Sequence, residues 1–282
     1  MHVRFLLPCP ALQPYVDHYL LMESSHAHDH LPVTVYPTPQ AAMVFHYRGQ
    51  TNEQVGARPV QASSNWAVKG FSTKKTAYLP QNQIGVLMVG FKPWGIQPFI
   101  GFQAEEITDT KLDLRLVYPN QTRLVEEQLM EADSTLERVR IVENFLLSVF
   151  RETSPDPLVM GSIRSICANK GMVKVSALSD AFCLSEKQFV RRFRNLTGVS
   201  PKFFSRLVRF QHILKLLDSG RVDLLNLAVQ SGFYDRSHFI HEFMEFTGTT
   251  PLAYLQENAR TELGTYFDSH VEDSPFYYRV YQ

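Results

Sequence analysis

One segment of this chain occurs twice, and the repeat limits the possible folds more than any bulk property. The copies are "CLSEKQFVRRFRNLTGVSP", from Cys183 to Pro201, and "SGFYDRSHFIHEFMEFTGTTP", from Ser231 to Pro251. Each carries a Phe, a second Phe four residues later, and then Thr-Gly-x-[ST]-Pro. Because such a repeat arises when one supersecondary unit is built twice, we expect two similar units in the C-terminal half.

Each copy predicts a helix with one apolar stripe. At about 100° per residue the stripe holds Phe189, Phe193 and Leu196 in the first copy, and Phe239, Phe243 and Phe246 in the second. The opposite face of the first helix carries Lys187, Val190, Arg191 and Arg194. The opposite face of the second carries Ser237, Ile240, His241 and Met244. A helix anchored by one stripe and presenting cations on the other face suits entry into the major groove of DNA.

The charge distribution agrees with this interpretation but does not establish it. The whole chain is formally neutral, yet Gly161 to Arg260 holds 14 Lys and Arg against 8 Asp and Glu. The segment from Ser185 to Lys215 is the most basic, with Glu186 as its single acidic residue. A basic cluster of this size is often a solvated face, so the repeat must carry the inference.

The rest of the sequence predicts a β-rich half followed by a helical half. Short β-branched and aromatic runs such as "AAMVFHYR" and "IGVLMVGFKP" precede residue 115, and stretches such as "RGQTNEQVGARP" are expected to be turns between them. Two helices follow, within "NQTRLVEEQLMEA" and "STLERVRIVENFLLSVFRE"; Ser134 and Glu137 form a capping-box pattern in the second. The Pro residues of "TSPDP" (153–157) end this helix and mark the boundary between the halves.

The second copy resembles the helix-turn-helix signature of the AraC/XylS family of transcription regulators. The matching elements are Leu227-Ala228, Gly232-Phe233, Ser237-x-Phe239, Phe243 and Gly248-x-Thr250-Pro251. The first copy resembles the family's other helix-turn-helix, including a turn that is one residue shorter. The resemblance covers about 158–260, over a third of the chain.

The resemblance implies an α+β protein with three parts. These are a β-rich, cupin-like barrel with two following helices at 1–153, an all-α double helix-turn-helix domain at 158–260, and a C-terminal tail at 261–282. The helices near 185–197 and 235–247 are expected to read successive major grooves. The residues expected to contact DNA are Lys187, Val190, Arg191, Arg194, Arg236, Ser237, Ile240 and His241.

The same resemblance implies the partners. We expect double-stranded DNA, RNA polymerase, a small-molecule effector and a second copy of the chain, with no cofactor and no enzymatic activity. A homodimer would pair through the helices at about 120–152, whose apolar residues are Leu124 and Leu129 on the first helix and Val142, Phe145, Leu146 and Val149 on the second; the alternative is that these helices only cover the barrel. Three widely spaced cysteines and the lack of a secretory leader or a membrane-length apolar run favour the bacterial cytoplasm, at the nucleoid.

Two departures from the family pattern affect these expectations. Cys183 stands where the first turn usually has Gly, and Ser179 where Ala is usual, so slight strain is expected in that turn. The second reading helix carries Asp235, Glu242 and Glu245, which argue against strong phosphate contact there. We therefore expect the basic copy to supply most of the affinity for DNA and the base readout. The near-neutral copy is expected to position the protein on DNA and to discriminate between sequences.

The N-terminal half offers weaker signals. Among its many aromatic residues, Tyr47, Trp66 and Trp94 are candidates to line an effector pocket. The segment "HAHDH" (His26–His30), with His46, supports an alternative in which a metal-dependent cupin-like enzyme is fused to the DNA-binding module. A third hypothesis, a DNA-repair regulator that accepts alkyl groups on Cys9, lacks an activating neighbour in the sequence.

Overall fold

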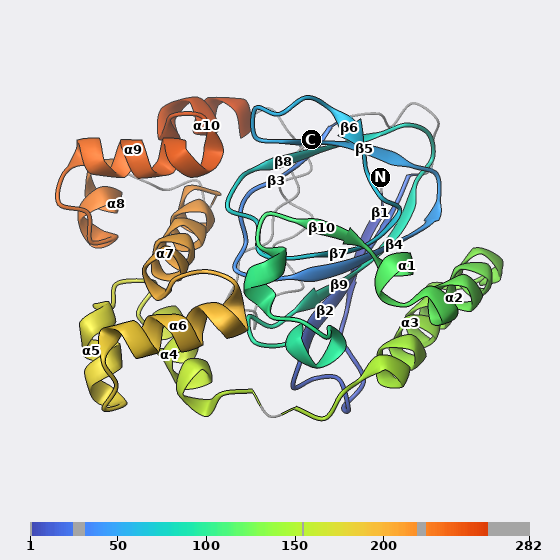
Figure 1. The fold of residues 1–282 in the computed structure, drawn as a ribbon. Helices are drawn as coiled ribbons and strands as arrows, with labels where there is room; N and C mark the ends of the chain where they lie inside the picture. The colour runs from blue at the N-terminus through green and yellow to red at the C-terminus, as the bar shows by residue number, and fades with distance from the viewer. Residues whose placement is uncertain (1, 25–31, 154, 219–223, 259–282) are drawn as a thin grey trace.

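The N-terminal half of the computed structural model consists of two antiparallel sheets that face each other (Figure 1). The structure describes residues 2–24, 32–153, 155–218 and 224–258. The larger sheet has the order β1 (His2–Leu6), β2 (Val16–Glu23), β9 (Gly85–Phe91), β4 (Ala42–Arg48), β7 (Trp66–Lys69) and β10 (Lys111–Asp113). The smaller sheet has the order β3 (Val33–Val35), β8 (Thr76–Pro80), β5 (Thr51–Val55) and β6 (Gln61–Ala62). The β-rich fold is confirmed, as two facing sheets rather than one closed barrel.

Alternation along the strands gives the larger sheet two apolar faces. One face carries Tyr19, Leu21, Met43, Phe45, Leu87 and Val89, all in the main hydrophobic core. The other face carries Leu20, Met22, Val44, Val86 and Met88, which point toward the smaller sheet. The sheet is therefore covered on both sides, by helices on one and by the smaller sheet on the other.

The covering helices are α1 (Leu114–Val117), α2 (Pro119–Glu131) and α3 (Thr135–Val149). Ser134 caps α3 by accepting a hydrogen bond from the Glu137 backbone N–H at 3.2 Å, as expected. The Glu137 carboxylate accepts from the backbone N–H of Asp133, one residue before the expected partner. The apolar residues expected on α3 are buried against the sheet, and the Phe145 ring meets Phe45 edge-on at 5.9 Å.

The segment Thr51–Val55 was expected to be a turn, and this expectation is wrong. It forms β5, a five-residue strand paired with β8 over its whole length. The sequence TNEQV has β-branched residues only at its two ends, and the three polar residues between them, Asn52, Glu53 and Gln54, do not signal a strand. It forms one nevertheless because Thr51 and Glu53 point inward, where Glu53 meets Lys111, while the other face of this small sheet faces solvent.

The C-terminal half is all α, with the elements in the expected order. They are α4 (Pro157–Ala168), α5 (Val175–Ala181), α6 (Glu186–Thr197), α7 (Pro201–Asp218), α8 (Leu224–Gln230), α9 (Arg236–Thr247) and α10 (Pro251–Asn258). Helix α7 runs between the two helix-turn-helix units (Figure 1), and its two ends belong to two separate hydrophobic cores. Within the described residues, no helix is long and apolar enough to cross a bilayer.

Candidate nucleic-acid interface and the adjoining cavity

The first unit, α5–α6, is built around a left-handed residue in its turn. Cys183 has φ 53°, the conformation that favours glycine, so the expected strain at this position is present. Ser185 then caps α6 in a capping box with Gln188, and Gly198 ends the helix at φ 85°. Phe189 and Phe193 are fully buried beneath the helix. These features fix which face of α6 is turned outward.

The second unit, α8–α9, repeats this construction with one more residue in the turn. Gly232 takes the left-handed position at φ 73°, and Asp235 caps α9 by accepting a hydrogen bond from the His238 backbone N–H at 2.7 Å. The cap lies three residues after Gly232, whereas Ser185 lies two after Cys183. Phe239, Phe243 and Phe246 form the buried stripe. The expected offset between the copies therefore lies in the turn.

The residues expected to read DNA lie largely on the outer faces of these helices. Lys187, Arg191 and Arg194 on α6 are exposed, and Val190 is half-buried. On α9, Arg236, Ser237 and His241 are exposed, while Ile240 is half-buried and packs against the second core. Both helices therefore present a polar outer face around one half-buried apolar residue.

Four of the basic residues in the first half of the domain are engaged by carboxylates. Arg192 pairs at 2.6 Å with Asp156, the N-cap residue of α4. Arg206 and Arg209 on α7 both hold Glu242 of α9, at 2.9 and 3.0 Å. Arg194 pairs at 2.5 Å with Glu105 of the N-terminal half. Among the described residues, Lys187 and Arg191 remain as reading-face cations of α6 without a carboxylate at ion-pair distance.

The acidic residues of the second reading helix have structural partners. Glu242 is 5% exposed and lies beneath α9, against the two α7 arginines. Glu245 also meets Arg206, and Asp235 is the helix cap. The near-neutral outer face of α9 thus results from internal pairing. Sequence reasoning missed the arginine partners of Glu242 and Glu245 because these arginines lie more than thirty positions away in the chain.

A short helix of the N-terminal half lies on the end of the first reading helix. This helix, η2 (Ala104–Ile107), approaches α6 so closely that a Cβ on Gly198 would lie 2.9 Å from the Ala104 carbonyl oxygen. The Thr108 hydroxyl donates a 2.7 Å hydrogen bond to the Gly198 carbonyl, beside the Glu105–Arg194 pair. The N-terminal half therefore contacts a helix that is expected to bind DNA.

Further contacts join the two halves through apolar side chains. Phe71 and Trp94 belong to the first helical core, where the Phe71 and Phe204 ring centroids are 6.4 Å apart. Tyr36 packs on the second core, against Phe210 and Tyr254. Gln211 of α7 donates a 2.5 Å hydrogen bond to the Pro37 carbonyl. Each helix-turn-helix core thus includes side chains from the N-terminal half.

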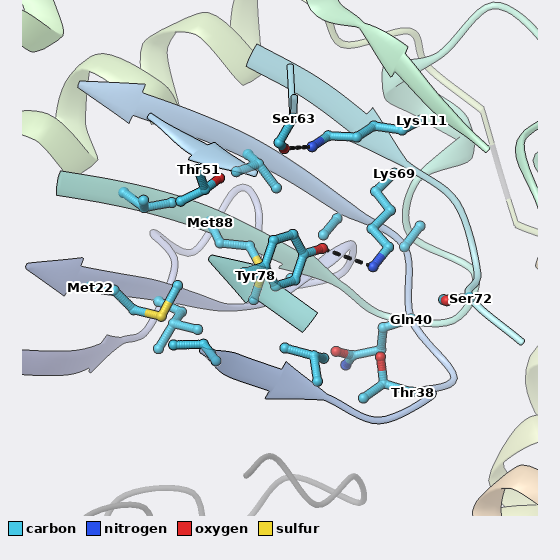
Figure 2. Close-up of a pocket in the computed structure, with 18 of the residues that line it drawn as sticks. Met22, Thr38, Gln40, Thr51, Ser63, Lys69, Ser72, Tyr78, Met88 and Lys111 are labelled. Carbon is cyan, nitrogen blue, oxygen red and sulfur yellow. Dashed lines mark hydrogen bonds between the residues drawn. The ribbon is translucent and has the colours of Figure 1, made fainter. Parts of the chain in front are cut away.

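A cavity of about 130 Å³ lies between the two sheets. Its wall is mostly apolar, with Leu20, Met22, Val44, Val86 and Met88 from the larger sheet and Val33 and Val35 from the smaller. Polar groups enter it from several strands (Figure 2): Thr51, Ser63, Lys69, Tyr78 and Lys111. Gln211 and Leu214 of α7 also line it, so the cavity reaches the helical C-terminal half.

Burial and lysine charge determine the electrostatics of this cavity. Burial, followed by the positive charge of Lys111, lowers the pKa of His46 to about 4, so its imidazole is neutral at cellular pH. Lys111 pairs with Glu53 at 3.2 Å and contacts Ser63, and Lys69 donates a 3.0 Å hydrogen bond to the Tyr78 hydroxyl. Within the described structure, Nδ1 of His46, Oγ1 of Thr51 and Oε1 of Gln211 are buried without a hydrogen-bond partner.

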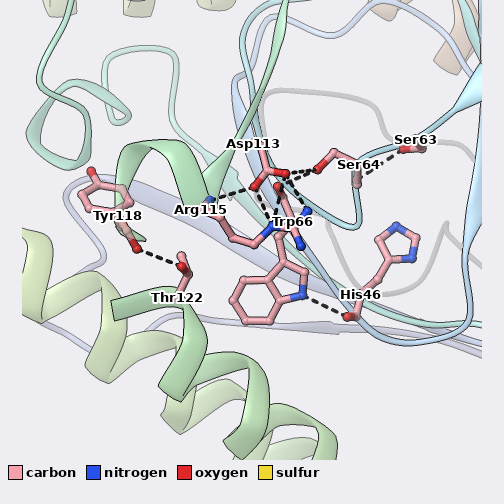
Figure 3. Close-up of polar contacts among 8 residues, drawn as sticks. All are labelled: His46, Ser63, Ser64, Trp66, Asp113, Arg115, Tyr118 and Thr122. Atoms are coloured by element: carbon pink, nitrogen blue, oxygen red, sulfur yellow. Dashed lines mark hydrogen bonds and ion pairs between the residues drawn. The ribbon is translucent and has the colours of Figure 1, made fainter. Parts of the chain in front are cut away.

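The aromatic residues expected to line a pocket lie elsewhere. Trp66 is in the main core, where its indole N–H donates to the His46 carbonyl at 3.1 Å (Figure 3). Tyr47 donates to Glu23 at 2.7 Å, and Trp94 donates to the Pro14 carbonyl and packs on the helical domain. These three side chains point away from the cavity because their strand positions alternate with the lining residues, or because they lie outside the sheets. None of the three lines the cavity between the sheets.

A second polar cluster holds the edge of the larger sheet. Asp113 at the end of β10 accepts hydrogen bonds from Arg115 and from the Ser64 hydroxyl (Figure 3). The hydrogen bond from Arg115 contributes most to keeping the pKa of Asp113 below its ordinary value. This cluster fixes the strand that carries Lys111.

Two expectations fall outside the described residues. The segment His26–His30, proposed as a metal ligand set, lies there, as does the C-terminal tail at 261–282. His46, the other histidine of that hypothesis, lines the cavity. Among the described residues, no three His, Cys, Asp or Glu side chains gather closely enough to hold a metal ion.

Comparison with known proteins gives two matching family models. A model described as "Helix-turn-helix domain" matches residues 178–257, and one described as "Domain of unknown function (DUF6597)" matches residues 4–113. The chain is 31% identical over 121 residues to the HTH-type transcriptional activator RhaR of Salmonella dublin, covering 42% of this chain and 40% of that protein. The same values hold for RhaR of Salmonella typhimurium. The chain therefore spans about two fifths of the length of these relatives.

Solved structures give more distant similarities. ToxT from Vibrio cholerae O395 is 12% identical, with a TM-score of 0.44 over 84% of this chain and 96% of that one. The C-terminal domain of AraT, a response regulator from Geobacillus stearothermophilus, is 18% identical, with a TM-score of 0.36 over 42% of this chain and 98% of that one. The double helix-turn-helix geometry, the match to the helix-turn-helix family model and the similarity to RhaR together show a C-terminal double helix-turn-helix domain that is similar to those of the AraC/XylS family of transcription regulators.

Proposed function

We propose that this protein is a sequence-specific DNA-binding regulator of transcription that reads two successive major grooves with α6 and α9. The observation that carries the proposal is the pair of units on α7, each with a buried Phe stripe and an exposed polar face. Helix α7 has 18 residues and is therefore roughly 27 Å long, which sets the two units apart on the scale of one B-DNA turn of about 34 Å.

The base contacts are assigned to the exposed residues of the two faces. Arg191 and Lys187 are exposed on α6 and have no carboxylate at ion-pair distance among the described residues; there Arg can donate two hydrogen bonds to a guanine and Lys can meet a guanine or a phosphate. Val190 and Ile240 would contact thymine methyl groups at the centre of each face. Ser237, His241 and Arg236 complete the α9 contact, and Arg194 joins the α6 contact when it leaves Glu105.

The inter-sheet cavity supports control by a small effector. Its wall includes Gln211 and Leu214 of α7, so a molecule inside it would touch the helix that joins the two reading units. Gly70, also in the wall, lies against η2: a Cβ there would come within 2.0 Å of the Ile107 carbonyl oxygen. Both routes from the cavity to the DNA-binding half consist of direct contacts, which physical coupling requires.

The remaining partners follow from the same function. A regulator of this kind acts on RNA polymerase at the nucleoid of the bacterial cytoplasm, and we propose that it does so as a homodimer. The α3 residues first considered for the dimer contact, including Phe145 and Leu146, are buried in the main core and cover the sheet. The exposed apolar residues Leu124, Leu136 and Leu147 on α2 and α3 take their place in the proposal.

Selection of bound fragments from the source genome, followed by substitution of the reading face, tests this function. Arg191→Ala should weaken binding to the selected operator by about 1–3 kcal/mol and relax specificity at one base pair. Arg123→Ala is the matched control, because Arg123 is 87% exposed on α2, in the other half of the chain. Equal loss in both variants would contradict the assigned face, and no enrichment of any sequence would contradict the function.

A further inference from the structure

The inter-sheet cavity carries more positive charge than its neighbours neutralise. Lys69 on β7 and Lys111 on β10 are direct partners in the antiparallel ladder, an arrangement that places two like charges side by side. Glu53 pairs with Lys111, whereas Lys69 bonds to the neutral hydroxyl of Tyr78. No carboxylate within the described ranges lies at ion-pair distance from the Lys69 ammonium. The cavity thus holds one cation whose counter-ion must come from elsewhere.

We propose that the cavity binds a small amphipathic monoanion, with a carboxylate on Lys69 and an apolar body between the sheets. This inference rests on the proposed function, because it names the effector class of that regulator. The carboxylate would accept a charge-assisted hydrogen bond from Lys69 and a second bond from the Tyr78 hydroxyl, which is free to donate once it accepts from the lysine.

The size and lining of the cavity limit the body of the ligand. About 130 Å³ is close to the volume that accommodates one benzene-sized molecule. The apolar side chains around it are mostly aliphatic, with Phe5 and Tyr36 also in the wall, and Met22 and Met88 can adjust their shape to a ring or a short branched chain. The ligand is therefore a single-ring or short branched acid whose apolar body is about the size of benzene.

The charges also determine what the cavity excludes. Glu53 is already held by Lys111, so no free carboxylate within the described wall would receive the ammonium of an amino acid. His46 is neutral, and within the described structure its Nδ1 and the Oγ1 of Thr51, two residues of the cavity wall, are buried without a hydrogen-bond partner. These atoms can bond a hydroxyl or a carbonyl on the ligand but add no charge. Monoanions are accordingly favoured over zwitterions and cations.

Occupancy of this site would be felt by the DNA-binding half. Gln211 on α7 is 3% exposed, its amide N–H is bonded to Pro37, and its Oε1 faces the cavity region without a partner. Leu214, one turn later on α7, is also part of the wall. A ligand that packs on Leu214 and donates a hydrogen bond to Gln211 would stabilise the present position of α7 relative to any position in which these contacts are lost. Such a difference in affinity is the requirement for a ligand to shift a conformational equilibrium.

The test compares acids with their neutral isosteres on the full-length protein. Calorimetry and thermal shift would use benzoate, phenylacetate and 3-methylbutanoate against benzamide, phenylacetamide and 3-methylbutanamide. At least one acid should bind, and its amide should bind about tenfold or more weakly. Lys69→Met should weaken the acid by a similar factor, Lys69→Arg should retain most of the affinity, and Lys74→Met on the neighbouring exposed loop should change nothing.

Each contrary outcome is decisive. Equal binding of acid and amide, unchanged acid affinity in a folded Lys69→Met protein, or no binding by any acid would overturn the proposal. DNA binding is measured separately on the same samples. Operator binding without acid binding rejects this inference alone, whereas failure to bind any operator rejects the regulator function itself.

Discussion

At the residue scale, the turn of the first helix-turn-helix unit contains a strained position. Cys183 holds φ 53° at the place where the second unit has Gly232. A residue with a Cβ pays on the order of 1 kcal/mol for this conformation. The family resemblance marked this position, and the backbone angle supplies the physical reason for the usual glycine.

Replacing this cysteine with glycine should stabilise the protein. We expect Cys183→Gly to raise the free energy of unfolding by about 1 kcal/mol, because the strain is relieved and the Cys183 side chain is exposed and makes little contact. Urea denaturation would measure the change. Cys183→Ala retains a Cβ and is the control; equal stabilisation by both variants would show that strain is not the cause.

His46 gives the stability of the N-terminal half a dependence on pH. Its folded pKa is about 4 and its ordinary value is 6.5, so between these values the unfolded chain binds a proton that the folded chain does not. The free energy of unfolding therefore has its full value with respect to His46 above pH 6.5. It decreases as pH falls toward 4, by up to about 3 kcal/mol. His46→Gln should flatten the stability profile in this window. A profile with the same slope in the variant would show that His46 is not the group responsible.

At the element scale, buried charge attaches the second reading helix to α7. Glu242 lies beneath α9 and receives hydrogen bonds from Arg206 and Arg209. We expect Glu242→Leu to lower the free energy of unfolding by about 2–3 kcal/mol, because both arginines lose a common partner in a partly buried site. Glu245→Gln is the matched control, since Glu245 is 47% exposed and its pair with Arg206 is worth at most about 1 kcal/mol. Comparable losses in thermal denaturation would contradict this difference.

In the present arrangement Glu105 of η2 pairs with Arg194, a proposed DNA contact. Glu105→Gln should therefore raise the affinity of the unliganded protein for its operator, by about two- to fivefold, since the pair is partly exposed and worth at most about 1 kcal/mol. Fluorescence anisotropy at fixed salt would measure the change. Glu131→Gln removes the same charge from an exposed site on α2. If it has the same effect, general electrostatics and not the contact is responsible.

The sequence predicts an element correctly where its apolar residues follow one regular spacing. It does not predict an element or a contact that depends on a partner distant in the chain. The Phe stripes of α6 and α9 and the apolar face of α3 follow from helical spacing, so those elements and their outer faces could be anticipated. Strand β5 could not, because its inward Glu53 is stabilised by Lys111, 58 residues away. The same reason hid Glu105 and Glu242: each meets an arginine that only the folded chain brings near.

At the scale of the whole molecule, the two halves share their cores. Phe71 and Trp94 complete the first helical core, and Tyr36 packs on the second. The cavity between the sheets opens toward α7 through the same region. Its lining could not be read from the sequence, because it depends on which alternate residues of six strands face the smaller sheet. The aromatic residues Tyr47 and Trp66 stood out in the sequence, yet they pack on the opposite side, in the main core.

Assembly into a dimer would double the number of reading helices on one operator. Leu136 and Leu147 lie three turns apart on one face of α3, with the exposed Arg140 between them, and are 62% and 45% exposed; no described element covers these two leucines. Pairing of two such faces would make binding at the second half-site intramolecular and so raise the overall affinity. We expect a dimer in analytical ultracentrifugation at micromolar concentration, and Leu147→Arg should convert it to a folded monomer. Leu252→Arg on α10, with a similarly exposed leucine, should leave the dimer intact. A monomeric wild-type protein that binds a two-half-site operator one to one would contradict the assembly, because two copies are needed to occupy both half-sites.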